Sequence, residues 1–213
     1  ERSNNFSGSA SKKILVKEVL IKPEISGYYN FIFDRIAFAQ ISATSDSLLY
    51  FNVGENQTKG VNSVVSVLYD NFKINLGGSY VGRYNQLSTE KDIAEFSYSS
   101  EFNGSVTYAF TKPKLNVSAF FKHQGKLPGF GFNSDGEVAE QTIEAYQLLD
   151  ATISKVFWKK QLTLMVGCKN LLNVQNIQAS LAGNSAHSGG GRSIAIGTGR
   201  AFFVKLNLEF AKK

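Results

Sequence analysis

The sequence lacks several features that would point to a soluble enzyme or a disulfide-stabilised domain. Among 213 residues there is one cysteine, Cys168, and there are three prolines, so neither an intrachain disulfide nor a cysteine-based zinc site can form. No stretch approaches the roughly 18 consecutive apolar residues of a membrane helix. Charged residues make up 19% and aromatic residues 13% of the chain, a balance that argues against disorder for its body.

The positive charge is not arranged for nucleic-acid binding. The formal net charge is +6 and the isoelectric point is near 9.3, but the basic residues are scattered, with short clusters only at 12–13, 159–160 and 212–213. Without a basic stripe or a recognition helix, no nucleic-acid partner is expected.

The chain starts at Glu1 without a methionine or a signal peptide, so a mature product or a piece of a longer protein is expected.

Helical periodicity is nearly absent, and a period of two residues dominates from about residue 27 to the end. In the stretch 72–85, Phe72, Ile74 and Leu76 fall on one side of an extended chain, and Lys73 and Asn75 fall on the other. Similar alternation predicts strands at 27–43, 57–70, 72–85, 95–111, 114–125, 143–157, 161–172 and 199–211. A ninth strand is expected within 12–22.

The connections between these strands alternate in length. Tight turns are expected at 69–73, 111–114 and 158–161, and long, polar segments at 44–56, 86–94, 126–142 and 173–198. Aromatic residues gather at the strand ends: Tyr69, Phe72, Phe110, Phe157, Trp158 and Phe210 beside the turns, and Tyr84, Tyr98 and Tyr146 toward the long segments. This arrangement favours an all-β, antiparallel transmembrane β-barrel of about eight or nine strands over a soluble antiparallel sandwich.

Polar residues on the other side of the strands predict a wet lumen. They are Lys73, Asn75, Ser79, Arg83, Glu101, Asn103, Lys122, Gln124, Asp150, Lys169, Lys205 and Glu209. Glu101 and Asp150 are expected to bond with lysine or arginine partners there rather than to act as acid–base catalysts.

No catalytic residue, metal site or cofactor is predicted, and the chain is not expected to be an enzyme. His123 and His187 are not at metal-ligand spacing from each other or from Cys168. His123 is instead expected on the apolar side near the outer end of a strand. The glycine-rich stretch 189–200 lacks the Lys-Ser/Thr ending of a phosphate loop and precedes a strand.

Three segments resemble one family. "LYFNVGENQTKGVNSVVSVLYDNFKINLGGSYVGRYN" (49–85) resembles the late barrel strands of TonB-dependent outer-membrane receptors. "AYQLLDATISKVFWKKQLTLMVGCKNLLNVQNI" (145–177) is similar to their penultimate hairpin, and "GRAFFVKLNLEF" (199–210) to their closing strand. The match looks closest to receptors of the Bacteroidetes type. No segment resembles the N-terminal plug, and Ala211, Lys212 and Lys213 follow the aromatic residue on which the family usually ends.

The resemblance implies the C-terminal portion of a 22-strand barrel in the outer membrane. It implies a division into an N-terminal segment of uncertain role, 1–24, and barrel strands in 25–213. The implied function is active import of a scarce nutrient such as a siderophore, haem, corrinoid or oligosaccharide. The implied partners are outer-membrane lipid, the plug and the remaining barrel, TonB acting through the plug, a small-molecule ligand and a surface lipoprotein.

Candidate ligand contacts are cations and aromatic residues at the loop ends of the strands: Arg83, Tyr84, Lys126, Phe130, Phe132, His187 and Arg192. Two other functions stay open. One is a self-contained small outer-membrane barrel for anchoring or adhesion, and the other is a soluble β-sandwich that binds sugar or protein.

Overall fold

The fold consists of strands joined by turns and loops. The computed structural model describes residues 2–34, 36–40, 48–52, 55–84, 95–132, 138–158, 161–181, 192–195, 197 and 199–209. Its strands are β1 (Arg2–Ser11), β2 (Ile14–Val16), β3 (Val19–Phe33), β4 (Ile36–Gln40), β5 (Leu48–Asn52), β6 (Glu55–Tyr69), β7 (Phe72–Tyr84), β8 (Phe96–Phe110), β9 (Leu115–Gln124), β10 (Leu127–Phe132), β11 (Val138–Ile143), β12 (Tyr146–Phe157), β13 (Leu162–Lys169), β14 (Asn176–Leu181), β15 (Arg192–Ala195) and β16 (Ala201–Leu208). In these parts of the chain, no helix has the length and apolar character needed to cross a membrane.

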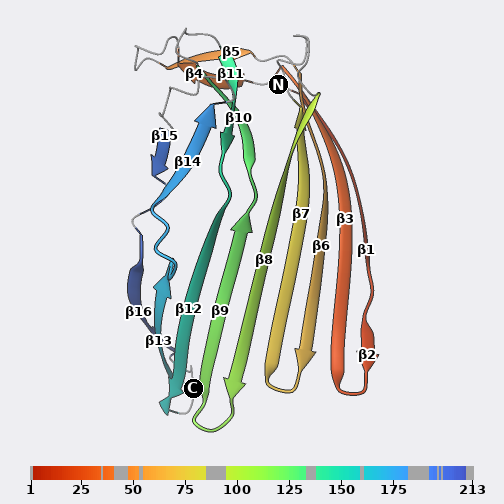
Figure 1. Cartoon of the computed structure of the whole chain (residues 1–213). Helices are drawn as coiled ribbons and strands as arrows, with labels where there is room; N and C mark the ends of the chain where they lie inside the picture. The colour runs from red at the N-terminus through yellow and green to blue at the C-terminus, as the bar shows by residue number, and fades with distance from the viewer. Residues whose placement is uncertain are drawn as a thin grey trace.

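Ten strands form one antiparallel sheet in the order β1-β3-β6-β7-β8-β9-β12-β13-β16, with β2 also paired to β3. The eight expected strands from residue 27 onward each have a counterpart in this sheet. Figure 1 shows the tight turns together at one end and the long connections at the other. The expected alternation of short and long connections is therefore confirmed.

Each tight turn contains a residue in the left-handed backbone region among its described residues. These residues are Lys17, Asp70, Lys114 and Trp158, with φ values of 54°, 46°, 61° and 44°. The strand expected within 12–22 is divided by the first of these turns, because Val16 of β2 pairs directly with Val19 of β3. The sheet also includes β1, whose Ser- and Asn-rich sequence gave no strand prediction, and residue 24 lies inside β3.

The long segments are not loops throughout. A four-stranded sheet, β10-β11-β14-β15, and a two-stranded sheet, β4-β5, lie at the long-connection end. β10 and β11 pair with each other from Leu127 opposite Ile143 to Phe132 opposite Val138. They prolong the β9–β12 hairpin beyond the main sheet, so the expected long loop at 126–142 contains two strands.

The register sorts side chains by polarity. One row across the sheet consists of Ile21, Val67, Ile74, Val106, Ala119, Ala151, Cys168 and Phe202. The neighbouring row, on the opposite face, consists of Lys22, Ser66, Asn75, Ser105, Phe120 and Asp150. We call these the apolar face and the polar face, and the expected two-faced strands are confirmed.

In the described part of the chain, no second layer packs on the apolar face. Among the described residues, the buried apolar side chains are Cys168 and Ile177 alone, while Val106 and Leu206 are 39% and 60% exposed. A soluble sandwich would bury such a face against another sheet. An apolar face of this extent is instead compatible with contact to lipid, which disfavours the sandwich alternative.

The described sheet has two open edges. β1 and β16 lie at its ends and are not paired with each other in the described part of the chain. Because nine strands alternate in direction across the sheet, β1 and β16 both run from the long-connection end to the tight-turn end (Figure 1). The self-contained eight-strand barrel therefore has no counterpart in this arrangement.

Candidate lumen wall and its outer end

The polar face carries a hydrogen-bonded network that crosses several strands. Ser66 Oγ donates to Asn75 Oδ1 at 2.9 Å, and Asn75 Nδ2 donates to Ser105 Oγ at 3.1 Å. One row away, the hydroxyl groups of Thr107 and Ser118 lie 2.9 Å apart. Short hydroxyl and amide side chains can therefore bond across strands without closing over the face, as suits a hydrated wall.

The expected charged pair on this face is confirmed for Glu101. Its carboxylate lies 3.0 Å from Lys122 Nζ across β8 and β9. Asp150 behaves differently from expectation: its Oδ1 accepts a 2.8 Å hydrogen bond from the backbone N–H of Asn170. β13 ends at Lys169, so the backbone N–H of Asn170 lies beyond the strand pairing and needs another acceptor. The Asp150 carboxylate is that acceptor.

Asp150 belongs to a group of contacts at the outer end of β12, β13 and β16, which we call the clamp. Asn170 Nδ2 donates to Val174 O and Asn170 Oδ1 accepts from Val174 N, at 2.8 and 3.0 Å. Arg200 donates from its backbone N to Asn173 Oδ1 at 3.0 Å and from Nη2 to Leu171 O at 2.7 Å. The clamp thus joins the two ends of the long connection between β13 and β16.

The clamp unites the motifs that carried the family resemblance. Asp150 comes from "DAT", Asn170 and Asn173 from "KNLLN", and Arg200 from "GR". Asn170 and Asn173 have φ values of 53° and 57°, a region that asparagine tolerates better than most residues. Sequence reasoning missed the clamp, although the spacing of two asparagines in a turn was the signal that could have revealed it.

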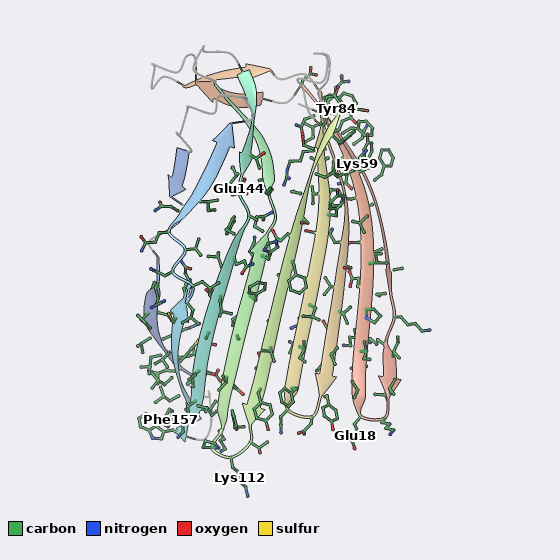
Figure 2. The ribbon with its side chains drawn as sticks, in the orientation of Figure 1. Glu18, Lys59, Tyr84, Lys112, Glu144 and Phe157 are labelled. Carbon is green, nitrogen blue, oxygen red and sulfur yellow. The ribbon has the colours of Figure 1, made fainter. Side chains whose placement is uncertain are left out.

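The candidate ligand contacts do not share one face. Arg83 lies on the polar face, where its Nη1 donates to Ser99 Oγ at 2.8 Å. Tyr84 is the next residue along β7 and therefore lies on the apolar face, where its ring packs on Phe96 with centroids 5.7 Å apart. Figure 2 shows Tyr84 and Lys59 at the end opposite the tight turns.

The remaining candidates are placed only in part. Lys126 is exposed and forms an ion pair with Glu144, with Nζ 3.0 Å from Oε2. Phe130 and Phe132 lie in β10 and Arg192 begins β15, but their side chains lie outside what the structure describes. His187 also lies outside the described residues.

The aromatic belts are confirmed with one correction. Phe72 packs on Tyr108 near the turns, and Tyr80 stacks on Tyr98 toward the outer end, with centroids 4.4 and 5.1 Å apart. Tyr146 pairs with Gln124, which pairs with Glu101. Tyr146 therefore lies on the polar face and is not part of the outer belt, because the pleat of β12 turns it away from lipid. Phe210 lies outside the described residues.

No group of three or more His, Cys, Asp or Glu side chains suited to a metal ion occurs in the described ranges. His123 shares a row with Phe102 and Gln147, so its expected position on the apolar side near the outer end of β9 is confirmed.

Comparison with known proteins identifies the family. Residues 3–189 match the outer membrane protein beta-barrel family. The chain belongs to this family. The protein is therefore a β-barrel component of the outer membrane, and its apolar face lies against membrane lipid. It matches no curated protein.

Two solved structures share the fold. One is the Pseudomonas aeruginosa receptor FpvA bound to heterologous pyoverdines, with 15% identity, a TM-score of 0.60, and coverage of 98% of this chain and 27% of that chain. The other is the ferripyoverdine receptor of the outer membrane of Pseudomonas aeruginosa bound to ferripyoverdine, with 15% identity, a TM-score of 0.59 and the same coverage. The chain thus spans about a quarter of these receptors, and its resemblance to a portion of a TonB-dependent receptor barrel is confirmed at the level of the fold.

Proposed function

We propose that this chain forms part of the wall of an outer-membrane, TonB-dependent active transporter that imports a scarce nutrient. The observation that carries the proposal is an open, two-faced wall: a sheet with one apolar and one polar face whose edges β1 and β16 are both unpaired in the described region. Exposed strand edges are unsatisfied in hydrocarbon, so further strands must complete them. The fold match to about a quarter of two receptors supports the same assignment.

The polar face also supports contact with a plug. Apolar side chains interrupt it, and the most exposed include Val64, Leu68 and Phe120, which are 43%, 38% and 45% exposed. If this face met only water, these apolar side chains would stay exposed and would not contribute the stabilisation that comes from burial. A protein plug that packs on this face would cover them, while the surrounding Ser, Asn and Thr side chains supply hydrogen bonds.

Transport is tested by uptake in intact cells, with an iron–siderophore complex such as ferripyoverdine as the first labelled probe. Deletion of the gene should abolish accumulation, and deletion of TonB should abolish accumulation while binding at the cell surface persists. A haem, a corrinoid and an oligosaccharide provide the next probes. Rapid, energy-independent flux through the purified protein in liposomes would contradict active import.

Arg83 is the candidate ligand contact that the geometry favours most, because it is exposed on the polar face near the outer end of β7. Arg83→Ala should weaken binding of the transported ligand without impairing barrel assembly. Tyr84→Ala is the matched control, because its side chain lies on the opposite face. Equal loss of affinity in both variants would reject the assignment of Arg83.

A further inference from the structure

The inference concerns a cavity beside the clamp. The cavity has a volume of about 440 Å³ and is lined by His123, Glu144, Ala145, Tyr146, Gln147, Leu172, Val174, Asn176 and Ile177. Its volume falls within the range of about 300–1,000 Å³ that is typical of small-molecule sites. His123 and Gln147 lie on the apolar face and Tyr146 lies on the polar face, so residues from both faces of the wall line the cavity, and His123 and Gln147 form its lipid-side part.

The position of the cavity along the membrane normal follows from the point at which apolar side chains give way to polar ones along β9 and β12. On β9 the apolar face runs through Leu115, Val117, Ala119 and Phe121 before His123 follows, and on β12 Leu149 is followed outward by Gln147. From Leu115 to His123 the strand rises roughly 26 Å along its axis. With the usual tilt of about 40° this is roughly 20 Å of membrane depth, close to the outer boundary of an apolar band about 25 Å tall.

The two sides of the cavity differ in chemistry. Leu172, Val174 and Ile177 supply an apolar side, and Ile177 is only 4% exposed. The clamp holds this segment in place through the Asn170–Val174 hydrogen bonds. His123, Gln147 and Asn176 supply polar groups, and the Nδ1 atom of His123 is shielded from solvent without a hydrogen-bond partner in the described structure.

The charged residue among those that line the cavity is Glu144, and it is paired with Lys126, whose Nζ lies 3.0 Å from Oε2. The site therefore offers hydrogen bonds without net charge, which suits hydroxyl groups better than a bare phosphate.

We propose that this cavity binds the sugar headgroup of an outer-leaflet glycolipid. The acyl chains lie along the apolar rows of β9 and β12, and the sugar hydroxyl groups reach His123 and Gln147. The proposal depends on the outer-membrane location of the chain and not on import. Glycolipid binding and nutrient import can therefore be refuted independently.

The experiment measures lipid that remains bound to the protein purified in mild detergent from its native outer membrane. Lipopolysaccharide and phospholipid are both quantified per protein by mass spectrometry. The variant combines His123→Leu with Gln147→Leu, which keeps the lipid-facing surface apolar and therefore compatible with assembly. Ser63→Leu is the matched control, because Ser63 is exposed on the apolar face and does not line this cavity.

The wild type and the control should retain about one equivalent of lipopolysaccharide, and the double variant roughly tenfold less, because two hydrogen bonds are lost. Uptake of the transported nutrient should be unchanged in the double variant. Equal lipopolysaccharide retention in all three proteins, or retention of phospholipid alone, would overturn the proposal. Loss of nutrient binding with unchanged lipid retention would instead place the cavity on the transport route, which also overturns it.

Discussion

At the scale of single residues, Asn173 fixes the end of the long connection that returns to β16. Its Oδ1 accepts the backbone N–H of Arg200 at 3.0 Å. Asn173→Ala removes this acceptor, and we expect a loss of about 1 kcal/mol of local stability. Hydrogen exchange of the Arg200 amide should therefore become roughly fivefold faster.

Two controls accompany this variant. Asn173→Asp keeps an acceptor oxygen and should exchange like the wild type. Gln175→Ala removes only a 3.5 Å contact to Asn173 and should have little effect. Unchanged exchange at Arg200 in Asn173→Ala would show that the clamp does not depend on this bond.

Gly82 is a second residue whose replacement has a clear expected result. A Cβ atom at Gly82 would lie 2.7 Å from the ring of Tyr98, and that ring stacks on Tyr80 with an interplanar angle of 6°. Lys59, which pairs with Gly82, reaches the same aromatic group with Nζ 3.6 Å from the centroid of Phe96. Gly82→Val should displace the stacked ring and destabilise the sheet by about 1–3 kcal/mol.

Thermal unfolding in detergent, followed by loss of the heat-resistant folded band on a gel, measures this effect. Gly8→Val is the matched control, because Gly8 lies on the same face and a Cβ there meets nothing within 4 Å. If both variants unfold alike, the close approach of Tyr98 to Gly82 does not limit stability.

At the scale of one strand, successive residues of β7 lie on opposite faces of the sheet, so one strand meets two different solvents. Leu76 is 45% exposed on the apolar face, and Ser79 lies on the polar face opposite Asn62 and Glu101. Leu76→Lys places a charge in lipid and should cost about 2–4 kcal/mol if Leu76 lies near the bilayer midplane. Ser79→Lys places the charge on the polar face beside Glu101 and should be tolerated.

The amount of assembled, heat-resistant protein in outer-membrane fractions distinguishes these two variants. The Leu76→Lys protein should be depleted and the Ser79→Lys protein should match the wild type. The opposite order would mean that the polar face, and not the apolar face, meets lipid.

The strands show how much the sequence predicts. Alternation such as Phe72, Ile74, Leu76 against Lys73 and Asn75 defined β7 almost to its ends, because one apolar face per strand imposes a period of two. β1 escaped prediction because Asn4, Gly8 and Ala10 weaken the contrast between its faces.

The site was less predictable than the strands. The face on which a side chain lies depends on whether its position in the strand is odd or even. Because Arg83 and Tyr84 are adjacent in β7, they cannot both face the lumen. The clamp requires contacts between Asn173 and Arg200, which are 27 residues apart in sequence. Local pattern carries no information on such a pairing, since it depends on the register of β12, β13 and β16.

At the scale of the whole molecule, the arrangement predicts an orientation in the membrane. The tight turns gather at one end, where Figure 2 places Glu18, Lys112 and Phe157, and the small sheets lie at the other end. Outer-membrane barrels place short turns in the periplasm and long loops outside. An epitope tag inserted between Lys112 and Pro113 should therefore be hidden in intact cells, whereas a tag in the connection 85–94 should bind antibody there.

Permeabilising the outer membrane should expose the Lys112–Pro113 tag without changing the signal from 85–94. The same experiment tests the direction of the open edges, because β1 and β16 both run toward the tight-turn end. If the Lys112–Pro113 tag were labelled on intact cells, the sheet would be inverted, the cavity beside His123 would face the periplasmic leaflet, and a glycolipid of the outer leaflet could not reach it.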